Sequence, residues 1–284
     1  MVGQQGITDM AGIGETIRKW KFSRRLKRVE ETLVGKRASL QRLEASLQCN
    51  PSDAEAANQL GLCCDALGKF DTAAAHYALA KEICWHHQDY DSGYAMMVHR
   101  ADSLLKGGHL DEGRQVIESV LQESEAGHVH SQARAALASV LCNLDRLTEA
   151  EGVLPPSLDK DPRTATARFA SGVLLGVRGR IRAQRGDLTG AGQDFERARR
   201  YLAGSASGTN EVKSSEGVLQ ARLGHTRRGL TLLESAFDYF ARENPCFAGA
   251  IAKEAARLCE QASLSVDHQR WSALSSHINQ ALQS

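Results

Sequence analysis

The chain has 284 residues and a formal net charge of +1, with 42% hydrophobic and only 5% aromatic residues. A balance this close to neutral excludes a chain that binds nucleic acid or membrane through its overall charge. Alanine, leucine, arginine, glutamate and glutamine are plentiful, and this composition favours helices packed through small side chains over a β-rich fold. We therefore predict an all-α protein.

The cysteines indicate a reducing compartment. There are seven of them, an odd number, at irregular spacing, which is typical of reduced thiols and not of a disulfide framework. The sequence has no apolar run of about 18 residues, and its first residues lack the apolar segment of a signal peptide. We expect a cytoplasmic location, either free or peripheral to a membrane or a larger complex.

The N-terminal part of the chain is basic. Residues 1–42 hold ten Lys or Arg and four acidic residues, a net charge of +6, so the remainder carries −5. Residues 1–12 are small and polar, and we predict a flexible N-terminus there. Leucines at intervals of seven follow, but Gly35 and Lys36 interrupt them, since glycine weakens a helix interior and lysine disrupts an apolar seam. Residues 13–50 therefore predict a basic helical hairpin that turns at Gly35.

The segment from Pro51 to Trp85 has the clearest pattern. Apolar residues recur at i, i+4 and i+7 on both sides of Gly68, which places them on one face of each of two helices. Gly61 is small enough for the two helices to approach closely. The apolar positions are Leu60, Cys64 and Leu67 before Gly68, and Ala73, Tyr77 and Ala80 after it.

These residues resemble a tetratricopeptide repeat, whose pattern includes a Leu-Gly pair, a turn glycine followed by an aromatic, and then Ala, an aromatic and Ala. The pattern returns along the chain, with steps of 40, 37, 41 and 38 residues between turns. Repeats of this length resemble the longer variants of the family, and HEAT-type repeats rank second because they lack such turns. The turn residues are Gly68, Gly108, Asp145, Gly186 and Gly224.

The resemblance implies an α-solenoid, a right-handed superhelix of antiparallel helical hairpins. Residues 51–245 form five units, with a Gly/Ser-type connector at 203–209 between the fourth and the fifth. Residues 246–284 lose the repeat pattern and predict C-terminal capping helices. The fourth unit departs from the family, since Arg178 and Arg182 occupy positions that are normally apolar.

In this family the first helices line a concave surface that binds peptides, and the resemblance implies a partner protein or peptide there. The corresponding residues here are Asn58, Leu62, Asp65, Val98, Asp102, Ser139, Asn143, Arg180, Gln184, Val218 and Arg222. Acidic groups stand at one end of this series and arginines at the other, which would orient a bound segment by charge. The family's clamp for chaperone tails is not predicted, because Leu62 and Ala136 cannot donate hydrogen bonds to a carboxylate.

A second candidate surface is the basic stretch between residues 18 and 28. Its basic and aromatic residues could contact acidic lipid or nucleic acid, or pack on the first repeat with the charges in water; the apolar register into Val29 favours packing. The residues are Arg18, Lys19, Trp20, Lys21, Arg24, Arg25, Lys27 and Arg28.

Catalytic and metal motifs are absent from the sequence. We find no Gly-x-Ser-x-Gly, phosphate loop, His-Glu-x-x-His or Cys-x-x-Cys. His86-His87 and His128-x-His130 lack the convergent partners that zinc needs, so no metal or cofactor is predicted. We predict a non-catalytic scaffold or adaptor that binds a partner on the concave surface. A peptide-responsive regulatory sensor and a peripheral membrane or nucleic-acid adaptor remain as alternatives.

Overall fold

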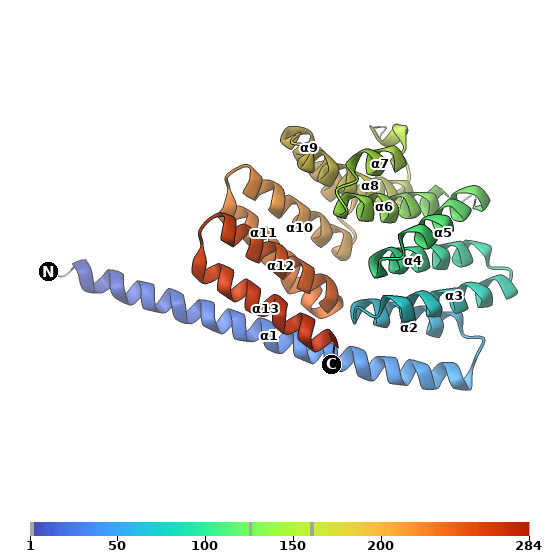
Figure 1. Ribbon diagram of the computed structural model, residues 1–284, viewed down its shortest axis with the longest axis horizontal. Coiled ribbons are helices and arrows are strands. Elements are labelled where there is room, and N and C mark those ends of the chain that lie inside the picture. The colour runs from blue at the N-terminus through green and yellow to red at the C-terminus, as the bar shows by residue number, and fades with distance from the viewer. Residues whose placement is uncertain (1–2, 125–126, 160–161, 284) are drawn as a thin grey trace.

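The computed structural model describes residues 3–124, 127–159 and 162–283, without the side chains of residues 3–15, 17, 18, 157 and 159. Within these ranges the chain forms α-helices, one 3-10 helix and no strand, which confirms the all-α prediction. Successive helices pair as antiparallel hairpins in a curved array, an α-solenoid (Figure 1). The elements are α1 (Gly3–Cys49), α2 (Ala54–Ala66), α3 (Phe70–His86), α4 (Tyr90–Gly107), α5 (Leu110–Glu123), α6 (Gly127–Asn143), α7 (Leu147–Val153), η1 (Pro156–Asp159), α8 (Ala165–Gln184), α9 (Leu188–Tyr201), α10 (Ala206–Arg222), α11 (Thr226–Glu243), α12 (Pro245–Gln261) and α13 (Ser265–Gln283).

Each predicted turn residue lies in the left-handed region, where glycine is favoured. After Gly68, the amide of Lys69 donates to the carbonyl of Cys64 at 2.9 Å, which closes the end of α2. Ser263 also has a positive φ and lies between α12 and α13, so these two helices form a sixth hairpin. The φ angles at the five predicted turns are 69° at Gly68, 93° at Gly108, 59° at Asp145, 89° at Gly186 and 83° at Gly224.

Small residues set the close approach inside the hairpins. A Cβ atom added at Gly61 would lie 2.5 Å from the ring of Tyr77, and one added at Gly179 would lie 2.6 Å from the ring of Phe195. Both aromatic rings are fully buried, and each stands 16 residues after its glycine. The fourth hairpin therefore has the same register as the first.

Alanine at Gly61 or Gly179 is expected to lower the free energy of unfolding by about 1–3 kcal/mol, because the added methyl overlaps a buried ring. The matched control is Gly35→Ala. Nothing lies within 4 Å of a Cβ added at Gly35, so alanine should raise the free energy of unfolding by about 0.5–1 kcal/mol in a helix interior. Urea unfolding followed by circular dichroism measures all three. A loss of stability at Gly35 would mean that the chain turns there.

Three clusters of buried side chains form the core. The largest runs from α4 to α10. A second joins Val29 and Leu33 of α1 to α11, α12 and α13, and it includes Leu67 from the end of α2. The third lies in the first hairpins, with Leu40 and Leu47 of α1 packed against it. The first and last hairpins thus share a core with each other and with α1.

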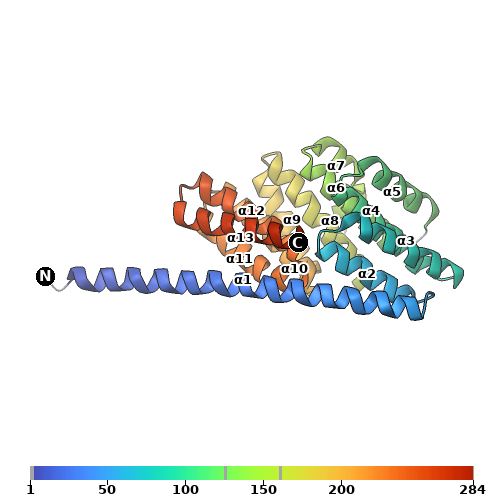
Figure 2. The same ribbon diagram turned by 60° about the horizontal axis from the view of Figure 1, so that its bottom comes forward.

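The predicted N-terminal hairpin is wrong, because α1 is one helix from Gly3 to Cys49. The segment predicted to be flexible is also helical from Gly3 onward. Figure 2 shows α1 running along one side of the molecule, with the other helices on its other side. Its leucines at intervals of seven pack on both ends of the array, and Leu40 contacts the second and third clusters. This burial outweighs the roughly 1 kcal/mol that Gly35 costs a helix.

Polar contacts fix α1 to the C-terminal hairpins. The Arg25 guanidinium donates to both carboxylate oxygens of Asp238, with nitrogen–oxygen distances of 3.0 and 3.3 Å. It also lies over the ring of Trp271, 5.3 Å from its centroid. Arg37 donates to the carbonyl of Ala281 in the last turn of α13.

The connector predicted at 203–209 is shorter than expected. Helix α10 already begins at Ala206, and the Ser205 hydroxyl accepts the Gly208 amide at 3.1 Å as an N-cap. The Thr209 hydroxyl donates to the carbonyl of Leu202 at 2.9 Å. These hydrogen bonds order a stretch whose composition is typical of a linker.

Candidate functional site

The predicted groove residues lie on α2, α4, α6, α8 and α10, the helices on the inner side of the array (Figure 1). Helices α4, α6, α8, α10 and α12 touch in sequence, and α12 also touches α2. A hydrogen bond from Ser103 of α4 to Asp65 of α2, 2.8 Å long, joins the remaining pair. The inner helices therefore form a closed circuit.

The predicted residues differ in how far a partner could reach them. Leu62 is 40% exposed and Gln184 is exposed as well, whereas Val218 is half-buried. Val98 is only 5% exposed and belongs to the largest core cluster, so its assignment to the binding surface is wrong. The side-chain oxygen of Asn58 is buried without a hydrogen-bond partner among the described residues.

Asp65 is held by its neighbours. Its carboxylate accepts hydrogen bonds from the Tyr77 hydroxyl at 3.1 Å and from the Ser103 hydroxyl at 2.8 Å. Burial raises the pKa of Asp65, while Lys106 and these hydrogen bonds act in the opposite direction. Asp65 thus connects α2, α3 and α4 at the inner side.

Three predicted residues meet between α6 and α8. The Arg180 guanidinium donates to the Ser139 hydroxyl at 2.8 Å and to the side-chain oxygen of Asn143. Arg222 of α10 donates to the carbonyl of Ala183, in the last turn of α8, at 2.5 Å. Polar residues predicted to bind a partner therefore form hydrogen bonds between neighbouring inner helices.

Two charged residues of this surface, Lys106 and Glu211, were not predicted. Burial alone would lower the pKa of Lys106, but Asp102, Asp65 and Glu211 outweigh it and raise that pKa. Lys106 could have been found, since it stands two positions before Gly108, just as Asn143, Gln184 and Arg222 precede their turn residues. Glu211 lies near the start of α10 and had no such signal.

Glu211 faces groups from other helices across the inner side. Surrounding protein raises the pKa of its carboxyl, while Arg180 of α8 and Lys106 of α4 act to lower it. Its side chain is nevertheless exposed to solvent. Acidic and basic groups of α4, α8 and α10 therefore act on one another across the inner side, which does not fit the prediction of acids at one end and arginines at the other.

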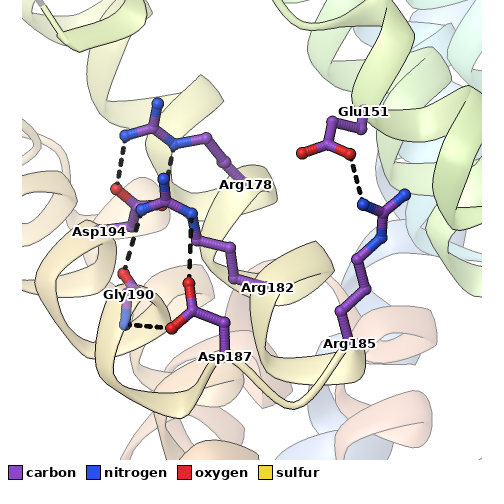
Figure 3. Close-up of polar contacts among 7 residues, drawn as sticks. All are labelled: Glu151, Arg178, Arg182, Arg185, Asp187, Gly190 and Asp194. Atoms are coloured by element: carbon purple, nitrogen blue, oxygen red, sulfur yellow. Dashed lines mark hydrogen bonds and ion pairs between the residues drawn. The ribbon is translucent and has the colours of Figure 1, made fainter.

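The arginines that depart from the family pattern in the fourth hairpin bind a buried aspartate (Figure 3). Asp194 of α9 is 1% exposed, and Arg178 donates to both of its oxygens at 2.9 and 2.7 Å. The Arg182 guanidinium also forms ion pairs: Nη1 lies 2.9 Å from Oδ2 of Asp194, and Nε lies 3.8 Å from Oδ2 of Asp187. Paired charges thus replace apolar packing between α8 and α9. The fourth hairpin therefore keeps the helix register of the first hairpin despite these two arginines.

The basic stretch of α1 divides into two sides. Arg25 and Arg28 face α11 and form ion pairs with Asp238, at 3.0 and 3.7 Å. Arg24 instead lies over the exposed ring of Trp20, 5.2 Å from its centroid. Lys19 and Lys21 are exposed, Lys27 pairs with Glu31 at 3.8 Å, and the side chain of Arg18 is outside the described part.

The histidines considered as metal ligands make other contacts. The rings of His86 and His87 contact each other, with centroids 5.5 Å apart, and His130 contacts the carbonyl of Ser124 at 2.6 Å. Among the residues with described positions, no group of three or more His, Cys, Asp or Glu could hold a metal ion. No helix in the described ranges is both long and apolar enough to cross a membrane.

The fold and the inner surface define an α-solenoid of helical hairpins, and comparison with known proteins finds a family match in one segment of it. Residues 36–87, the end of α1 with the first hairpin, match the family model described as tetratricopeptide repeat. The match to a tetratricopeptide repeat is therefore shown for this segment, and the remaining hairpins repeat its fold. A solved structure described as "YrrB: a TPR protein with an unusual peptide-binding site" is similar at 18% identity and a TM-score of 0.33, covering 69% of this chain and 91% of that one. The comparison with curated proteins gives no match.

Proposed function

We propose that this protein is a non-catalytic scaffold that binds a segment of a partner protein at the inner side of the solenoid. The observation that carries the proposal is that charged groups of α4, α8 and α10 act on one another's pKa at the inner side, where Lys106 and Glu211 are exposed to solvent. Repeat solenoids use such inner surfaces for extended partners.

The chemistry of the lining favours a segment with mixed charge. The Glu211 carboxylate accepts no hydrogen bond from the described residues, and the protein around it raises its pKa. A partner that donates hydrogen bonds would stabilise the carboxylate there. Leu62, exposed at the same side, offers an apolar contact, and groups of both signs would select and orient the partner.

Affinity capture from native lysate, quantified by mass spectrometry, tests the proposal. The wild-type chain is expected to retain a protein partner in stoichiometric amount. The combined change Lys106→Ala, Gln184→Ala and Glu211→Ala should reduce its recovery about tenfold or more, because truncating central interface residues costs at least 1–2 kcal/mol. All three side chains are exposed, so the fold should persist.

The matched control places the same number of truncations on outer helices: Gln115→Ala and Glu118→Ala on α5, and Arg200→Ala on α9. It should capture the partner as the wild type does. Equal loss in both variants, or purification of the wild type as a lone monomer, would overturn the proposal. One small molecule retained per chain would indicate a regulatory sensor instead.

A further inference from the structure

The first part of α1 has two different sides. Residues two positions apart on an α-helix are about 200° apart, so Trp20 and Phe22 point to opposite sides. Phe22, Leu26 and Val29 pack on the C-terminal hairpins. Trp20 is 57% exposed and lies on the side away from these hairpins.

Basic residues surround this open side. The outer face of α1, as we define it, is centred on Trp20, Arg24 and Lys27, with Lys19 and Lys21 at its two opposite edges; all five side chains are exposed. The sequence from Thr16 to Val29 contains seven basic residues and no acidic one.

The array pairs with the inward-facing arginines of this stretch. Arg25 and Arg28 pair with Asp238. Lys21 and Arg24 have no acidic partner among the described residues, and Lys27 reaches only the exposed Glu31, at 3.8 Å. The positive charge therefore remains on the outer face.

We propose that the outer face of α1 binds the surface of a membrane rich in acidic phospholipid. An amphipathic helix with lysine and arginine beside tryptophan lies in the interfacial plane, where the cations meet anionic headgroups and the indole enters the headgroup boundary. The helix is also placed for this contact. The hairpins all lie on one side of α1, so a flat surface can meet its other side without touching them (Figure 2).

A nucleic acid would also attract the positive charge, but phosphate contacts need only the cations. The exposed tryptophan beside them is suited to the headgroup boundary of a bilayer. Trp20 itself could stack on a base, so nucleic-acid binding is measured as a competing outcome.

Flotation of the full-length chain with vesicles tests the proposal. The protein is expected to float with vesicles of phosphatidylcholine mixed with phosphatidylserine and not with phosphatidylcholine alone, and salt should reduce the binding. Each basic residue near the surface contributes about 1 kcal/mol, or about fivefold in affinity. The combined change Lys19→Glu, Lys21→Glu and Arg24→Glu should therefore reduce binding more than a hundredfold. Trp20→Ala should weaken it at unchanged charge.

The control carries the same change in charge at another exposed place: Arg227→Glu, Arg228→Glu and Arg242→Glu on α11. Thermal unfolding shows whether each variant keeps its fold. No flotation of the wild type with acidic vesicles, or equal loss in the α11 control, would overturn the proposal. Binding to single-stranded RNA that depends on Trp20, without vesicle binding, would overturn it and assign the face to nucleic acid. The partner capture that tests the inner surface uses different residues, so either proposal can fail alone.

Discussion

Replacing Leu33 with alanine is expected to lower the free energy of unfolding by about 2–5 kcal/mol, the usual loss when a buried leucine is truncated. Leu33 is 2% exposed and packs in the core shared by α1, α11, α12 and α13. Its neighbour Val34 is 65% exposed, so Val34→Ala should change stability by no more than about 0.5 kcal/mol. Urea unfolding of the two variants gives the comparison.

Hydrogen exchange extends the same experiment to individual elements. Leu33→Ala should increase exchange in α13 and at the end of α2, because Leu67 and Leu274 share the core with Leu33. Equal stability of the Leu33 and Val34 variants would show that α1 is not docked on the array. It would then favour the short hairpin predicted from the sequence.

The second large effect is expected at Asp194. Its replacement by alanine should lower the free energy of unfolding by about 3–5 kcal/mol, because Arg178 would remain largely buried without its partner. Calorimetry or urea unfolding measures this loss. The matched control is Glu151→Ala, which removes an exposed partner 2.6 Å from Arg185 (Figure 3) and should cost at most about 1 kcal/mol.

Both substitutions remove the carboxylate partner of an arginine. They differ mainly in burial, because the pair of Asp194 is buried and that of Glu151 is exposed. A loss at Asp194 no larger than the loss at Glu151 would mean that Arg178 reaches water once its partner is gone. The buried ion pair would then contribute no more to the fourth hairpin than a surface pair does.

The hairpins of the array could be predicted from the sequence because their determinants are local. A turn residue with positive φ ends each first helix, and a glycine placed 16 residues before a buried aromatic sets the contact in the first and fourth hairpins. Even Asp145, which is not glycine, was found by its spacing. Local chemistry also explains why Arg178 and Arg182 do not shift the register, since their partner Asp194 lies on the paired helix.

Features that depend on distant residues could not be predicted in this way. Gly35 and Lys36 suggested a turn because the sequence does not show that leucines on both sides of them bind opposite ends of the array. The charged residues of the inner surface could not be fully predicted for the same reason. Glu211 joins Lys106 and Arg180 only because the inner helices form a closed circuit, which no single repeat encodes.

The position of α1 also bears on how the chain folds. Repeat arrays without distant contacts fold and unfold one unit at a time, and their end units fray first. Here the outermost units are joined through α1, and the pair Arg25–Asp238 connects residues 213 positions apart. Closing so long a loop costs entropy that is offset only when both ends are in place, which makes it a late step. The molecule thereby gains the cooperativity of a globular domain from units that individually need only their neighbours.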